Sequence, residues 1–205
     1  NLASDKPVFV LVHGLASNAR MWDGVGEELQ RRDWPSIAVD LRGHGLSDKP
    51  DSGYDFDTVA HDLVSLVRAL DLARVVIVGQ SWGGNVVVHA LHRHPDVFTS
   101  GVAVDGGFIE LGAAFESWPE CAERMQPPRL AGTRSSRLES AIRAMNSDWP
   151  ETWTRNKERA LATALDRLER GRVHWFRPAH HDLHAQFPHA TAGVLISNVL
   201  DGFLT

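Results

Sequence analysis

A serine flanked by glycines two positions away is the part of this sequence that most directly suggests chemistry. Residues 79–83 read Gly-Gln-Ser-Trp-Gly, with Ser81 at the centre. An apolar run precedes them and a stretch of helical periodicity follows, which is the strand-turn-helix setting of a nucleophilic serine. The small residues let strand and helix approach closely, and the helix start directs free N–H groups toward the turn. We expect Ser81 to be a nucleophile; the alternative is a glycine-rich turn with a capping serine.

A serine hydroxyl needs a neighbouring base, and the chain offers eleven histidines. Residues 180–184 read His-His-Asp-Leu-His, and the four-residue spacing of His180 and His184 would also suit zinc. The glutamate that stands beside the first histidine in the zinc-protease motif is missing. We therefore expect no metal and no other cofactor.

The elements that would position these residues alternate along the first half of the chain. Continuous apolar runs predict strands at 7–12, 36–40, 74–79 and 99–104. Amphipathic periodicity predicts helices at 18–32, 57–70 and 82–93. Strands that alternate with helices indicate an α/β fold with a doubly wound, mostly parallel sheet.

The alternation is lost in the middle of the chain. Residues 110–153 contain four prolines and only weak helical patterns, and we interpret them as a partly helical lid inserted into the core domain. The core domain would then comprise 1–109 and 154–205. Its second part is predicted to contain a helix at 155–170, a fifth strand at 172–176 and a terminal helix at 190–203.

With these elements placed, the sequence resembles the α/β-hydrolase fold family. Four features carry the resemblance: His13-Gly14 after the first strand with Trp22 beyond it, the loop Arg-Gly-His-Gly-Leu-Ser-Asp at 42–48, the glycines and serine at 79–84, and His181 followed by His184 and Pro188. Their order matches the family over about residues 7–105 and 172–205, whereas the middle has no specific match.

The resemblance implies roles for particular residues. Ser81 would be the nucleophile, and the backbone N–H groups of Leu15 and Trp82 would form an oxyanion hole. The base would be His181, which stands seven residues before a proline as in the family pattern, with His180 as the alternative. His180 also occupies a position where the family usually has glycine. His13 could orient the oxyanion loop or make a purely structural hydrogen bond.

The acidic partner of the histidine is harder to assign. Most relatives carry it after a strand between the counterparts of 99–104 and 172–176, and no such strand is recognisable between 105 and 155. A minority carry it at the end of the strand beside the nucleophile strand, where this chain has Asp105. We take Asp105 as the candidate acid, with a loop-capping role as the alternative. Asp148 and Asp166 are further candidates.

The unrecognised strand also raises a question of hydrogen bonding. Omitting an inner strand would leave two backbone edges unpaired in the core, which is costly. We expect either that 172–176 pairs directly with 99–104, or that residues of the natural protein are absent from this sequence. We favour the second interpretation, under which the acid itself can lie outside the sequence.

Composition excludes several classes of function. The net charge of −5 gives no basic face for nucleic acid. The single cysteine, Cys121, excludes an internal disulfide, and no apolar stretch has the length of a membrane span. Residues 1–7 lack the apolar core of a signal peptide, so a cytoplasmic location is expected. Neither composition nor motif indicates an oligomeric state.

Serine at position 81 argues against branches of the family that need a carboxylate nucleophile there. The expected reaction is two-step cleavage of a small ester or lactone through an acyl-enzyme. Carbon–carbon bond hydrolysis and cofactor-free perhydrolysis would use the same residues. A non-catalytic protein that binds or senses a small ligand on this scaffold is the alternative from another class.

Overall fold

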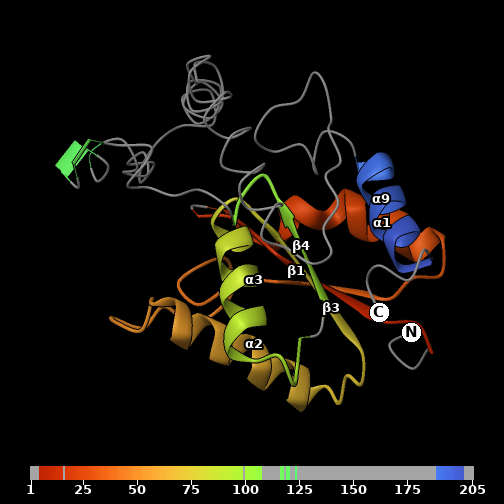
Figure 1. Ribbon diagram of the computed structural model, residues 1–205, viewed down its shortest axis with the longest axis horizontal. Helices are drawn as coiled ribbons and strands as arrows, with labels where there is room; N and C mark the ends of the chain where they lie inside the picture. The colour runs from red at the N-terminus through yellow and green to blue at the C-terminus, as the bar shows by residue number, and fades with distance from the viewer. Residues whose placement is uncertain are drawn as a thin grey trace. The chain divides into compact units, whose positions relative to one another are not determined.

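A parallel sheet forms the centre of the described structure. The computed structural model describes residues 5–15, 17–98, 100–107, 116–117, 119–120, 123 and 188–200. Their four strands pair in the order β2-β1-β3-β4, every pair parallel (Figure 1). The strands are β1 (Val8–Val12), β2 (Ser36–Val39), β3 (Val75–Gln80) and β4 (Ser100–Val104). The predicted parallel sheet is confirmed, and each strand boundary lies within one residue of its expected place.

The inner strands are the most apolar because both of their faces are covered. Every residue of β1 and β3 is buried, as expected for strands of a parallel sheet with helices on both sides. In the register, Val12 pairs with Val39 of β2 and with Gly79 of β3. The residues that follow β1, β2 and β3 therefore emerge at the same edge of the sheet.

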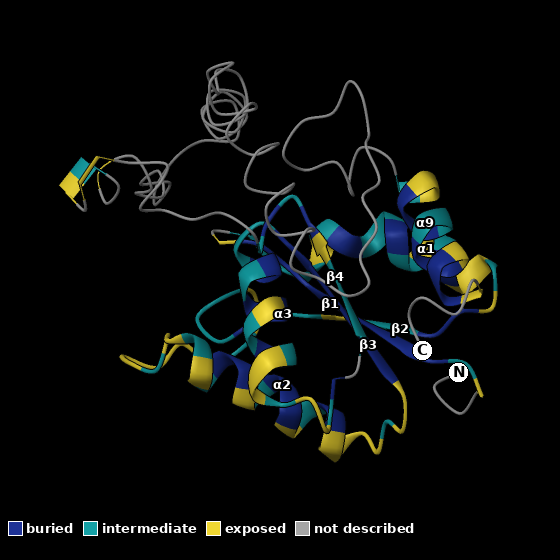
Figure 2. Ribbon diagram, in the orientation of Figure 1, coloured by how far each residue is buried: buried dark blue, intermediate teal, exposed yellow. Residues whose placement is uncertain are grey.

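Helices cover the sheet on both faces. α2 (Phe56–Ala69) and α3 (Trp82–Arg93) lie on one face, and α1 (Asp23–Arg31) and α9 (Pro188–Leu200) lie on the other (Figure 1). Alternate residues of β1 divide between the two cores: Val10 and Val12 pack toward α2 and α3, whereas Phe9 and Leu11 pack toward α1 and α9. Exposed residues of α2 and α3 lie on their outer sides (Figure 2). The doubly wound arrangement is thus confirmed.

The helix boundaries follow local capping. The Asp55 side chain accepts a hydrogen bond from Thr58 N–H at 2.9 Å and caps α2. Asn18 accepts one from Arg20 N–H at 3.0 Å, but it caps a 3₁₀ turn at Ala19–Trp22 rather than one continuous helix over 18–32. Such tighter turns are frequent at helix starts, and residue periodicity does not distinguish them from α-helix.

The terminal helix begins two residues earlier than the periodicity predicts, at Pro188. The fixed φ of proline suits the first turn of a helix, where no partner is needed for the missing N–H. α9 packs against α1, and a methyl group built on Gly24 would lie 3.0 Å from Pro188 Cβ.

The remaining predicted elements lie outside the described residues. These are the helix at 155–170, the strand at 172–176 and most of the lid at 110–153, which stay predictions. The chain divides into two compact units, 1–107 with 176–205 and 108–175, and the helices and strands named above belong to the first. Among the described helices, none is long and apolar enough to cross a membrane.

Candidate active site

Ser81 occupies a one-residue turn between β3 and α3. Its backbone has φ 54° and ψ −122°, a conformation that residues with a side chain rarely adopt. Two hydrogen bonds hold this conformation: Ser81 N–H donates to Val104 O at 2.9 Å, and Gly84 N–H donates to Ser81 O at 2.8 Å. Strain of this kind persists only where the surroundings enforce it, and it is concentrated at functional sites.

The flanking glycines are needed because backbone meets backbone at this turn. A Cβ on Gly79 would lie 2.1 Å from Gly83 O, and one on Gly83 would lie 2.6 Å from His13 O. A Cβ on Gly106, after β4, would lie 2.0 Å from Ser81 O. The glycine spacing that marks the sequence is therefore a packing requirement of the strand-turn-helix unit.

The loop after β1 lies against the serine. A Cβ on Gly14 would be 3.0 Å from Ser81 Cβ and 2.5 Å from Gln80 Oε1. Leu15 comes next, with 47% of its side chain exposed. The N–H of Trp82, the first residue of α3, belongs to the helix start, where N–H groups have no partner within the helix. The structure thus places Leu15 and Trp82 on the two segments that adjoin Ser81, and their oxyanion role stays a prediction.

The side chain of Trp82 is engaged elsewhere. Its ring stacks on Phe56 of α2 with 5.6 Å between centroids, and Phe56 in turn stacks on His89 of α3 at the same separation. This packing connects the start of α3 to α2. The stacked ring of Trp82 therefore helps to hold the backbone of the same residue in place.

His13 is fully buried and both of its ring nitrogens are hydrogen-bonded. Nε2 accepts from Leu41 N–H at 3.1 Å, so the proton resides on Nδ1, which donates to Gly14 O at 2.7 Å. Burial lowers the pKa of His13 below its ordinary value of 6.5, and the nearby ring of His44, 4.8 Å away between centroids, acts in the same direction. The neutral imidazole therefore links the loops after β1 and β2.

A depressed histidine pKa makes stability depend on pH. Below about pH 6.5 the unfolded chain binds a proton at this histidine before the native protein does. As the pH is lowered below about 6.5, the free energy of unfolding should therefore decrease, by up to about 1.4 kcal/mol per pH unit, until the native pKa is reached. Urea unfolding between pH 7.5 and 5 measures this slope. His13→Gln should have a smaller slope than the wild type; equal slopes in the two proteins would contradict the assignment.

Side-chain hydrogen bonds brace the loop 42–48. Arg42 forms a two-pronged ion pair with Asp62 of α2, at 2.5 and 2.7 Å, and donates a third bond to Gly53 O at 3.0 Å. The imidazole of His44 lies 2.9 Å from Arg42 O. These contacts stabilise the loop, and none of them involves Ser81.

Asp105 follows β4 directly, beside the serine turn. It lies between Val104, whose carbonyl accepts from Ser81 N–H, and Gly106, which contacts the Ser81 carbonyl. Its φ of 46° is unusual for a residue other than glycine. The structure therefore brings Asp105 into the neighbourhood of Ser81, and its role as the acid stays a prediction.

The remaining site residues lie outside the described part of the chain. These are the candidate bases His181 and His180, the metal alternative that pairs His180 with His184, and the candidate acids Asp148 and Asp166. In the part that the structure describes, no group of three His, Cys, Asp or Glu side chains could hold a metal ion.

One residue near the site was not singled out by the sequence. Asp40 follows β2 and accepts hydrogen bonds from Ala19 N–H at 2.7 Å and from Leu46 N–H at 2.8 Å. These bonds lower the pKa of the Asp40 carboxyl group. Its place directly after a predicted strand, at the edge where His13 and Ser81 emerge, was the available signal.

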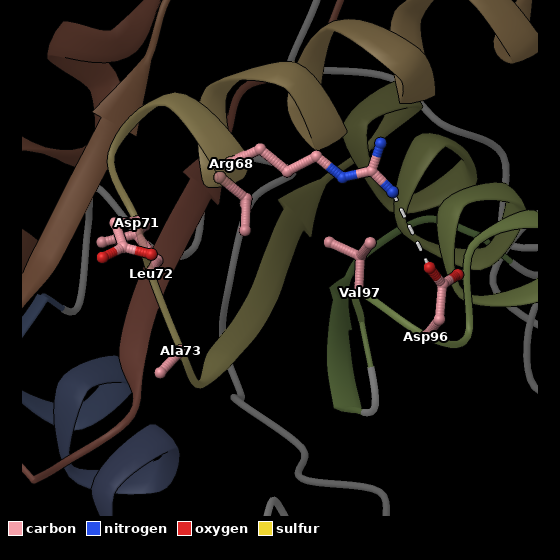
Figure 3. Close-up of a pocket in the computed structure, with 7 residues that line it drawn as sticks. Arg68, Asp71, Leu72, Ala73, Asp96 and Val97 are labelled. Atoms are coloured by element: carbon pink, nitrogen blue, oxygen red, sulfur yellow. Dashed lines mark ion pairs between the residues drawn. The ribbon is translucent and has the colours of Figure 1, made fainter.

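A cavity of about 250 Å³ lies at the opposite end of β3, away from Ser81 (Figure 3). Its lining comes from the end of α2, the residues before β3 and the turn after α3: Val67, Arg68, Asp71, Leu72, Ala73, Asp96 and Val97. Arg68 and Asp96 form an ion pair of 3.8 Å across it, and both side chains are mostly exposed. No nucleophile faces this cavity among its lining residues, so the candidate site remains at Ser81.

Comparison with known proteins agrees with this geometry. The chain is 39% identical over 99 residues to 2-(acetamidomethylene)succinate hydrolase of Mesorhizobium japonicum, covering 48% of this chain and 35% of that protein. It is 31% identical over 152 residues to the AB hydrolase superfamily protein YisY of Bacillus subtilis, covering 74% and 52% respectively. The solved structure of a thermophilic esterase from Thermogutta terrifontis matches with a TM-score of 0.50 at 28% identity, covering 58% of this chain and 41% of that one.

The chain thus spans between a third and about half of the length of these two curated relatives. A family model described as alpha/beta hydrolase fold matches residues 7–135, which include the four described strands and the serine turn. The order β2-β1-β3-β4, the serine between β3 and α3 and this match lead to one conclusion: the chain belongs to the α/β-hydrolase fold family.

Proposed function

We propose that the protein is a serine hydrolase that cleaves a small ester or lactone. The observation that carries the proposal is the strained turn at Ser81, held at φ 54° between a buried strand and the start of a helix. A plain capping serine has extended backbone and bonds to the helix start, whereas Ser81 makes no side-chain cap bond to α3. The turn therefore supports presentation of the hydroxyl rather than helix capping.

The reaction would proceed in two steps. Ser81 Oγ attacks the substrate carbonyl while His181 takes its proton, and the N–H groups of Leu15 and Trp82 stabilise the oxyanion. His181 then protonates the leaving alcohol as the tetrahedral intermediate collapses to an acyl-enzyme. Water, deprotonated by the same histidine, releases the acid and restores the hydroxyl of Ser81. Asp105 would hold the tautomer of His181 and stabilise its charged form.

The surroundings of Ser81 support an oxyanion at this position. The serine lies at the N-terminus of the twelve-residue helix α3, which is the positive end of the helix dipole. The first N–H groups of this helix are directed toward the turn. The loop of Gly14 approaches from the other side, within contact distance of Ser81 Cβ. The start of α3 favours negative charge beside the hydroxyl, as acyl transfer requires.

Covalent labelling tests the proposal directly. A fluorophosphonate probe reacts with an activated serine, so we expect one adduct, located by peptide mass mapping on the peptide that contains Ser81. Ser81→Ala should remove the adduct, whereas replacing the exposed Ser65 of α2 by alanine should leave it intact. A protein that is folded and acquires no adduct at Ser81 would refute the hydrolase and favour a ligand-binding protein on this scaffold.

A further inference from the structure

Two side chains, one from each loop, join the loops after β1 and β2 by hydrogen bonds. Because β1 and β2 pair up to their last residues, His13 and Asp40 occupy equivalent positions just beyond the strands. His13 accepts a hydrogen bond from Leu41 N–H in the β2 loop at 3.1 Å, and Asp40 accepts one from Ala19 N–H in the β1 connection at 2.7 Å. The segment 13–19 is thereby fixed at both ends.

The carboxylate of Asp40 uses both oxygens for backbone contacts. Oδ1 accepts from Ala19 N–H and Oδ2 accepts from Leu46 N–H, at 2.7 and 2.8 Å. The carbonyl of the same residue accepts from Ser47 Oγ at 2.6 Å. A Cβ on Gly45 would lie 2.0 Å from Oδ2, so the loop leaves room for this carboxylate only because residue 45 is glycine.

The segment between the two anchors contains the proposed oxyanion donor. A Cβ on Gly14 would lie 3.0 Å from Ser81 Cβ, and Leu15 is about half exposed. The position of the Leu15 N–H therefore depends on the anchors at His13 and Asp40. A misplacement of about 1 Å in such a group can cost about 100-fold in rate.

We propose that Asp40 is a positioning residue for the hydrolase reaction, because its carboxylate holds segment 13–19 where Leu15 N–H meets the oxyanion. The inference rests on the proposed function. Asp40 acts through the loop and touches no reacting atom, so its removal should lower kcat and weaken binding of transition-state analogues, while substrate KM stays the same.

Asp40→Asn tests the role with little change in shape. Asparagine keeps one acceptor oxygen and turns an NH2 group toward the second backbone N–H, so one of the two bonds is lost. The matched control is Asp55→Asn at the start of α2, where asparagine caps about as well as aspartate. For p-nitrophenyl acetate we expect kcat to fall about 10-fold in Asp40→Asn at unchanged KM, and to stay within about twofold in Asp55→Asn. Rates are expressed per Ser81 that reacts with fluorophosphonate, so unfolded protein does not count.

A second readout separates positioning from a loss of general structure. A trifluoromethyl ketone adds to the serine and places a negatively charged oxygen where the oxyanion would form. Its inhibition constant should rise about 10-fold in Asp40→Asn, in parallel with the loss of kcat. Gly45→Ala should shift both quantities in the same direction, because its methyl group displaces the carboxylate while the charge remains.

The outcomes are distinguishable. If Ser81 is required for hydrolysis but Asp40→Asn and Gly45→Ala both keep kcat within about twofold of wild type, the positioning role is overturned and the proposed function stands. A rise in KM with no change in the inhibition constant also overturns it. If hydrolysis by the wild type does not depend on Ser81, the proposed function fails and the positioning role fails with it.

Discussion

Ser81→Ala should lower kcat for p-nitrophenyl acetate by at least about 10⁴-fold, because the substitution removes the atom that attacks the carbonyl. The donors of the oxyanion hole remain in the variant, so a small residual rate above that of water alone is expected. KM should change little, since the hydroxyl is not a major substrate contact. The measurement is steady-state hydrolysis at saturating substrate, corrected for the uncatalysed rate.

The Ser81→Ala substitution should not prevent folding. Ser81 is held by its backbone, through Ser81 N–H to Val104 O and Gly84 N–H to Ser81 O, and alanine preserves both bonds. Ser65→Ala, on the exposed side of α2, is the control for a serine replacement elsewhere. Equal rates for the wild type and Ser81→Ala would show that hydrolysis does not use this hydroxyl.

Gly79→Ala should destabilise the protein by about 3 kcal/mol, the upper part of the range for overpacked sites. The added Cβ would meet Gly83 O at 2.1 Å and Gly84 N at 2.8 Å, and these backbone atoms have no rotamer by which to move away. Relief requires β3 and α3 to separate, which would also shift the Ser81 turn. Urea unfolding measures the loss of stability, and kcat of the folded fraction measures the shift of the turn.

Gly26→Ala is the matched control, and it should change the stability in the opposite direction. Gly26 lies inside α1, and a Cβ there would be 3.8 Å from Ser36 Oγ, an ordinary contact. Alanine is a better helix former than glycine, so this variant should be more stable than the wild type by roughly 0.5–1 kcal/mol. If Gly79→Ala proves as stable as the wild type, the close packing of β3 against α3 at the Ser81 turn is wrong.

The sequence was sufficient for the inner strands of the sheet because both of their faces are buried. Continuous apolar runs such as 7–12 and 74–79 are typical of strands inside a parallel sheet, so the type and boundaries of these strands could be predicted. The glycine spacing around Ser81 was equally informative, since the same contacts that require glycine also define the turn.

Contacts between loops could not be predicted in this way. The bond from Ala19 N–H to Asp40 joins residues that are 21 positions apart, and it forms only because the register of β1 and β2 brings their ends together. Nothing in the composition of 36–48 distinguishes Asp40 from the other acidic residues of the chain. The 3₁₀ turn before α1 was also missed, because periodicity averages over several turns and does not resolve one tight turn.

The predicted base and acid depend on different parts of the chain. Asp105 lies beside the serine turn because β4 pairs with β3, which is the place that the resemblance to the family implies for it. His181 was chosen because the resemblance to the family implies a base seven residues before a proline, here Pro188, and it lies outside the described residues. Labelling and hydrolysis by His181→Ala and His180→Ala variants would show which of the two histidines is needed.

The two faces of the sheet are completed at different times as the chain is synthesised. α2 and α3 leave the ribosome between the strands that they cover, whereas α9 emerges only after all four described strands. Phe9 and Leu11 on the α1 side therefore lack part of their cover until residues 188–200 have been made. A nascent chain stalled before that point would lack the apolar residues of α9 that complete the core on the α1 side, whereas α2 and α3 on the other face are already made.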